Sequence, residues 1–177
     1  MKKELIKLSG ILCVITLVAA LLLAGVNKLT APKIAQADAK AANEAMKKML
    51  PDADDFEKIN DDLYIAKKGN EEIGACVNVT VTGYGGDINM MVGINLPQST
   101  VAGIEILSHS ETAGLGAKAN EDSFKSQLKG KQPALTVVKN DTTNANELKA
   151  ITGATITSRA VAQGIRQAYS IIEKREG

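Results

Sequence analysis

Small hydroxyl side chains are concentrated in the segment AITGATITS at residues 150–158, directly before the last stretch with helical spacing. One hydroxyl residue is enough to cap the free N–H groups at a helix start, and most such clusters do only that. Here four are present, in the order Thr152, Thr155, Thr157 and Ser158. Hydroxyls and free amides at a helix start can all donate to phosphate oxygens, so the surplus predicts a phosphate site. A conventional phosphate loop is excluded, because the sequence has no GxxxxGK[ST].

Two other segments combine glycine with polar or aromatic side chains. HSETAGLG at residues 109–116 would let the backbone approach a flat ring closely, with Glu111 and Thr112 as hydrogen-bonding groups. GYGGDI at residues 83–88 has the glycines of a hairpin turn. Each of these segments, taken alone, is also typical of an ordinary turn.

The three segments together resemble, in sequence order, the motifs of a family of FMN-binding domains. These domains occur in the G subunit of Rnf complexes and in the C subunit of the sodium-translocating NADH:quinone reductase. TGAT at residues 152–155 is similar to the flavin-attachment motif [ST]-G-A-T, and HSETAGLG is similar to H-x-E-T-P-G-L-G. The resemblance implies that a flavin transferase links FMN through its phosphate to Thr155. The other cofactor-binding residues that it implies are Thr152, Gly153, Ala154, Thr157, Ser158, His109, Glu111, Thr112, Gly114, Leu115, Gly116 and Tyr84.

The sequence departs from the family pattern at two positions. Lys149 stands where the family usually has aspartate, three residues before the first hydroxyl residue, and Ala113 stands where it has proline. If the acid is important to the transferase, flavin attachment would be slower.

Within that family the chain looks most like the G subunit of an Rnf complex, which moves electrons between reduced ferredoxin and NAD while it translocates sodium ions or protons. The resemblance implies an electron-transfer subunit of a translocase, with no catalytic residue of its own and with other membrane and electron-transfer subunits as partners. Two alternatives stay open. One is a free-standing extracytoplasmic flavoprotein or regulator, and the other is an anchored binding module without a cofactor.

Composition narrows the function classes. The chain has 21 Lys and Arg against 20 Asp and Glu, for a net charge of +1, so it lacks the basic field that nucleic-acid binding needs. One histidine and two cysteines are too few for a zinc or iron–sulfur site. Any redox chemistry must therefore come from an organic cofactor.

The amino-terminal part predicts a membrane anchor. Residues 8–26 carry no charge, and as a helix they would span about 28 Å, which matches the hydrocarbon core of a bilayer. The run is long for a signal sequence, and the small residues at 37–39 lie too far downstream for cleavage. We therefore expect a transmembrane helix over 8–27, surrounded by lipid. The lysine bias favours a short cytoplasmic tail at 1–7 and an extracytoplasmic domain, in a single-pass protein of the cell membrane.

The predicted fold class is α+β: one transmembrane helix followed by one FMN-binding α+β domain. A linker helix is expected over 28–50, because alanine-rich helix-forming sequence stops at Pro51, and the domain over 51–177. Alternating valines predict a hairpin of 62–68 and 71–86 turned at Gly69 and Asn70. Further strands are expected at 88–94, 101–107 and 134–139, and helices at 121–128 and 158–173.

Overall fold

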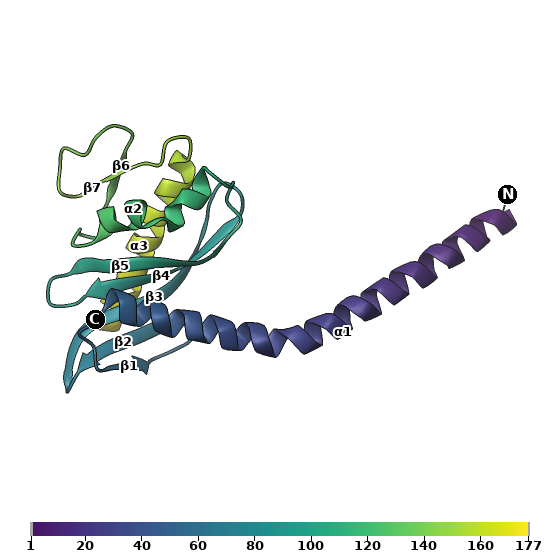
Figure 1. The fold of residues 1–177 in the computed structure, drawn as a ribbon, viewed down its shortest axis with the longest axis horizontal. Helices are drawn as coiled ribbons and strands as arrows, with labels where there is room; N and C mark the ends of the chain where they lie inside the picture. Colours follow the sequence, from purple (N-terminus) through teal and green to yellow (C-terminus); the bar gives the residue numbers. More distant parts are fainter. Residues whose placement is uncertain (1, 177) are drawn as a thin grey trace. The chain divides into compact units, whose positions relative to one another are not determined.

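The computed structural model describes residues 2–176 and divides the chain into two compact units, Met1–Lys40 and Ala41–Gly177. Helix α1 (Lys2–Met49) forms the first unit and ends within the second (Figure 1). The helices that we expected over 8–27 and 28–50 are therefore one continuous helix, with Pro32 inside it. Strong helix formers on both sides of Pro32, chiefly leucine and alanine, favour this continuity.

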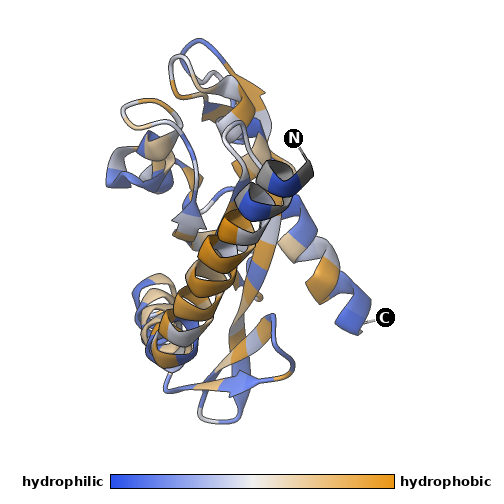
Figure 2. Ribbon diagram, turned by 90° about the vertical axis from the view of Figure 1, so that its right-hand side faces the viewer, coloured by the Kyte–Doolittle hydropathy of each residue, from blue (hydrophilic) through white to orange (hydrophobic). Residues whose placement is uncertain are grey.

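The first unit contains a long apolar stretch of α1 (Figure 2), and the large apolar residues between Ile11 and Ile34 are exposed. This helix contains an apolar stretch long enough to cross a bilayer, and no residue of that stretch is buried, so its length and composition suit a membrane crossing. A signal sequence would pass the same test. The hydroxyl of Thr16 donates to the carbonyl of Leu12 at 3.0 Å, which satisfies it within the helix. The exposed large apolar residues of this unit are Ile11, Leu12, Val14, Ile15, Leu17, Val18, Leu21, Leu22, Leu23, Val26, Leu29 and Ile34.

The second unit is built on a five-stranded antiparallel sheet whose strands are hydrogen-bonded in chain order. The predicted hairpin at Gly69, which has φ of 59°, is present, but its second strand ends at Thr82 rather than at residue 86, because the glycines at 83, 85 and 86 form the next turn. Each later predicted strand of the sheet is present and slightly longer than expected. The first strand was not predicted, because it is a short and mostly exposed edge. The strands are β1 (Asp55–Lys58), β2 (Leu63–Lys68), β3 (Glu71–Thr82), β4 (Asp87–Asn95) and β5 (Thr100–His109).

Helix α3 (Thr155–Glu176) covers one face of this sheet. The buried valines 77, 79 and 81 of β3 pack against its apolar stripe, which includes Val161 and Ile165. The approach is close at Gly164, where an added Cβ would lie 3.0 Å from the Met90 sulfur. This packing holds the start of α3 against a rigid sheet.

The remaining elements are short, and the bounds of several of them differ from those predicted from the sequence. The helix expected at 121–128 is one α-helical turn followed by a 3-10 turn. The strand expected at 134–139 is shorter, and it pairs in parallel with a strand that we did not predict. The last helix starts at Thr155 rather than at 158, because Gly153 with φ of 80° turns the chain just before it. These short elements are η1 (Gly116–Asn120), α2 (Asp122–Lys125), η2 (Ser126–Leu128), β6 (Thr136–Val138) and β7 (Glu147–Lys149).

The last turns of α1 cover the other face of the sheet. Ala45, Met46 and Leu50 are buried there with Cys76 and Met91. Glycines on the strands make room for these side chains. An added Cβ at Gly93 would lie 2.9 Å from the Cβ of Met49. The compact unit therefore begins at residue 41 rather than at the expected boundary of 51.

We predict that Met46→Ala destabilises the domain by about 2–5 kcal/mol, because it opens a cavity between α1 and the sheet. Lys47→Ala, an exposed change in the same turn, is the control and should stay within about 0.5 kcal/mol of wild type. Urea unfolding of the chain from Ala41 onward measures both. Equal effects would show that this turn lies outside the domain core.

Candidate functional site

A cavity of about 580 Å³ is lined by residues of the β3–β4 turn, the loop after β5 and the start of α3. This size is within the range of small-molecule and cofactor pockets. The fold thus brings together the three segments that the sequence indicated. The lining residues are Tyr84, Glu111, Thr112, Leu115, Gly116, Lys139, Ala150, Ile151, Thr152, Gly153, Ala154, Thr155, Ile156 and Thr157.

Three of the expected site residues do not line this cavity: His109, Gly114 and Ser158. Nδ1 of His109 accepts a hydrogen bond from the backbone N–H of Glu111 at 3.2 Å, so it supports the loop. Gly114 is exposed and has φ of 75°, which is a backbone requirement of the turn. Four lining residues were not expected. Ile151 and Ile156 flank the TGAT segment and could have been found as its neighbours, whereas nothing in the sequence linked Lys139 to it.

The carboxylate of Glu111 joins all three segments, although only 9% of the residue is exposed. Oε1 accepts hydrogen bonds from the N–H groups of Tyr84 at 2.7 Å and Gly85 at 3.0 Å. Oε2 accepts a hydrogen bond from the Thr157 hydroxyl at 2.6 Å. A buried carboxylate is tolerated only when it is paired or hydrogen-bonded, and this one has three donors.

Glycines leave the space that this carboxylate occupies. An added Cβ at Gly83 would collide with Oε1 of Glu111, and one at Gly116 would collide with Oε2. At Gly85 the collision would be with the carbonyl oxygen of Ser110. We expected Gly116 to make room for a flat ring, but the structure gives that room to Glu111 and Thr157.

Hydrogen bonding sets the charge of this group. Burial by itself would raise the pKa of Glu111, but the hydrogen bonds from Thr157, Gly85 and Tyr84 bring the pKa below its ordinary value of 4.5. Glu111 is therefore a carboxylate at neutral pH.

The four hydroxyls near the start of α3 have different roles. Ser158 is fully buried, accepts from the N–H of Ile151 and donates to the carbonyl of Ala154, both at 3.0 Å. It therefore ties the preceding turn to the helix. Thr157 is also fully buried and is bound to Glu111. Thr152 and Thr155 are left to face the cavity.

The residue directly before α3 is Ala154, so none of the hydroxyl residues takes the capping position that we considered. Thr155 is the first residue of the helix and is half-buried. The free N–H groups and the positive end of the helix dipole lie at this position and favour an anion. Lys139 adds an exposed cation to the same cavity.

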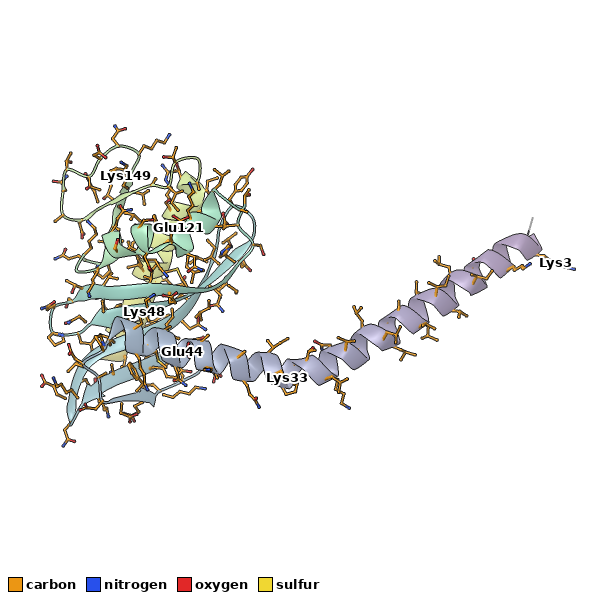
Figure 3. The ribbon with its side chains drawn as sticks, in the orientation of Figure 1. Lys3, Lys33, Glu44, Lys48, Glu121 and Lys149 are labelled. Carbon is orange, nitrogen blue, oxygen red and sulfur yellow. The ribbon has the colours of Figure 1, made fainter. Side chains whose placement is uncertain are left out.

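Lys149, the departure from the family pattern, lies on β7 and is labelled in Figure 3. Its Nζ is 2.5 Å from Oδ1 of Asp141. The ion pair holds the pKa of the Asp141 carboxyl below its usual value. The loop between β6 and β7 therefore places a carboxylate beside the lysine.

Comparisons with protein families agree with this site. The family model described as FMN-binding domain matches residues 83–170, which contain all three segments. The model described as RnfG N-terminal region matches residues 1–49. The class defined by fold and site is thus an FMN-binding domain behind an amino-terminal apolar helix.

Named relatives narrow the class. The chain is 43% identical over 154 residues to the G subunit of the proton-translocating ferredoxin:NAD(+) oxidoreductase complex of Clostridium ljungdahlii, covering 85% of this chain and 82% of that one. It is 34% identical over 194 residues to the Na(+)-translocating counterpart of Acetobacterium woodii, covering 97% and 93%. The chain belongs to the RnfG family, the G subunits of ion-translocating ferredoxin:NAD(+) oxidoreductase complexes, which are the Rnf complexes.

Solved structures show the same fold. The crystal structure of Shewanella oneidensis NqrC has a TM-score of 0.53 at 19% identity, covering 67% of this chain and 66% of that one. The C subunit of the Na(+)-translocating NADH-quinone reductase from Parabacteroides distasonis has a TM-score of 0.52 at 22% identity, covering 61% and 58%. The predicted fold class, an α+β domain after one apolar helix, is confirmed.

We predict that Glu111→Gln lowers stability in a pH-dependent way. Because the folded pKa is lowered, ionised Glu111 stabilises the fold above about pH 4.5, and this contribution is lost as the pH falls through the folded pKa. The free energy of unfolding of wild type should exceed that of the variant by about 1–3 kcal/mol at neutral pH, and this difference should become smaller in acid. Thermal unfolding from neutral pH to about pH 3 measures the gap. A constant gap would show that the charge contributes nothing.

Proposed function

We propose that this chain carries FMN bound covalently through its phosphate to Thr155. It relays electrons through this flavin as part of a ferredoxin:NAD(+) oxidoreductase complex that translocates sodium ions or protons. The observation that carries the proposal is the cavity in which a helix amino terminus, the Thr155 hydroxyl and Lys139 meet. FMN supplies the electron-transfer chemistry when bound, because a flavin accepts and donates electrons.

Thr155 is suited to hold the phosphate. Its side chain lines the cavity at the first residue of α3, where backbone N–H groups and the helix dipole favour a negative group. In the attachment step, Thr155 Oγ1 forms a bond to the flavin phosphorus. The phosphoanhydride bond of an activated flavin donor breaks, and the departing phosphate keeps the electron pair and takes the hydroxyl proton. No group is oxidised or reduced.

The rest of the cavity is suited to a flat, partly apolar ring. Tyr84, Leu115 and Ile156 are exposed large side chains, and each comes from a different segment of the cavity wall. A bound ring would cover these apolar surfaces and exclude water from them. The polar groups of Glu111 and Thr112 line the same wall and set the electrostatic environment of the ring.

The membrane part of the proposal rests on α1. Its apolar stretch anchors the chain in the cell membrane as a single span surrounded by lipid. The domain lies on the extracytoplasmic side, where a flavin transferase attaches FMN. The partners are the other membrane and electron-transfer subunits of the complex.

Thr155→Ala should abolish covalent flavin, because it removes the hydroxyl that forms the phosphoester. Co-expression with a flavin transferase, followed by intact-protein mass and in-gel fluorescence under denaturing conditions, measures the bond. Wild type should gain the mass of one FMN. Thr152→Ala, which removes the other hydroxyl of the TGAT segment that lines the cavity, is the matched control and should keep the flavin. Fluorescence in Thr155→Ala would place the bond at another residue.

Protease should cut the domain when it is added to right-side-out membrane vesicles. The loop at residues 141–145 is exposed, so it offers a cleavage site between β6 and β7. Inverted vesicles should protect it, and detergent should remove that protection. Cleavage in inverted vesicles alone would reverse the proposed orientation.

A further inference from the structure

Two threonines at the start of α3 have the same chemistry but different surroundings. Thr155 and Thr157 both line the cavity, two positions apart. Thr157 donates to Oε2 of Glu111 at 2.6 Å. The Thr155 hydroxyl has no hydrogen-bond partner among residues 2–176. Their availability to a ligand therefore differs, although both contribute a hydroxyl to one cavity wall.

Glu111 makes Thr157 unsuited to receive a phosphate. A hydroxyl has one proton to donate, and that of Thr157 is committed to a carboxylate in a charge-assisted hydrogen bond. The negative charge of Glu111 also repels an approaching phosphate group at this position. Both effects act in a buried place, where water screens charges weakly.

The other end of the TGAT segment has the opposite charge. Lys139 follows Val138, whose carbonyl accepts a hydrogen bond from the N–H of Ala150 at 2.8 Å. The backbone of Lys139 is thus next to the hydrogen-bonded pair of residues 138 and 150, and its exposed side chain lines the same cavity. The cavity lining therefore contains a cation as well as the Glu111 carboxylate, and the cation favours a phosphate there.

We propose that Glu111 is a positioning residue that directs flavin attachment to Thr155, because it holds the Thr157 hydroxyl and repels phosphate from it. The inference rests on the proposed function. The same carboxylate binds the N–H groups of Tyr84 and Gly85. The carboxylate that selects the threonine therefore also holds the β3–β4 turn in place on the cavity wall.

The test is the position of the flavin in Glu111→Gln, made in the full chain with a flavin transferase. Cleavage after Lys149 and Arg159 gives one peptide, 150–159, whose fragmentation distinguishes Thr155 from Thr157. Loss of the charge-assisted bond should raise the fraction of flavin on Thr157 by roughly 10- to 100-fold. A role limited to stability would lower total flavin without changing this distribution.

Three further variants make the result decisive. Glu111→Gln/Thr157→Val should return all flavin to Thr155, and Thr155→Ala/Glu111→Gln should carry it on Thr157. Glu111→Ala, which also removes the carboxylate, serves the same test if Glu111→Gln does not fold. Flavin confined to Thr155 in the folded Glu111 variants would overturn the inference alone. A wild-type chain without covalent flavin would overturn the proposed function and the inference with it.

Discussion

The buried carboxylate of Glu111 connects segments that are separated along the chain by tens of residues. One oxygen binds the turn between β3 and β4, and the other binds the first turn of α3. An ionised group in such a place is stable only while its donors stay in position, so the turn, the loop and the helix cannot shift independently. The hydrogen bonds of Glu111 thus fix the relative positions of the three segments that line the cavity. Glycines at 83 and 116 are part of this constraint, since any side chain there would enter the space of the carboxylate.

The sheet and α3 provide the frame on which this carboxylate acts. Close packing at Gly164 holds the helix on β3 and β4, and Gly153 turns the chain so that α3 begins at Thr155. The Ser158 hydroxyl stabilises this turn, because it accepts a hydrogen bond from the N–H of Ile151 and donates one to the carbonyl of Ala154. A hydroxyl on such an element is held with little conformational freedom.

The amino-terminal helix serves two environments. Its first part exposes an apolar surface that suits lipid, and its last turns are part of the core of the domain. Met46 and Leu50 lie over the sheet face opposite to α3, so each face of the sheet is covered by a helix. An ion pair between Lys48 and Glu105 at 3.5 Å joins the end of α1 to β5. The family match over residues 1–49 covers both parts of the helix.

The sequence by itself determined the apolar helix, the positions of the long strands along the chain, the α+β class and the three motifs, because these depend on local periodicity and on residue type. It also distinguished the TGAT hydroxyls as unusual. Only the tertiary structure distinguished the Thr157 hydroxyl, which is hydrogen-bonded to Glu111, from those of Thr152 and Thr155, since the partner of Thr157 lies 46 positions away in the sequence. The short strand β7, its pairing with β6 and the contribution of Lys139 were likewise invisible, because three-residue pairing and a single lysine carry no periodic signal. Long-range contacts that depend on exact backbone approach cannot be obtained from local pattern.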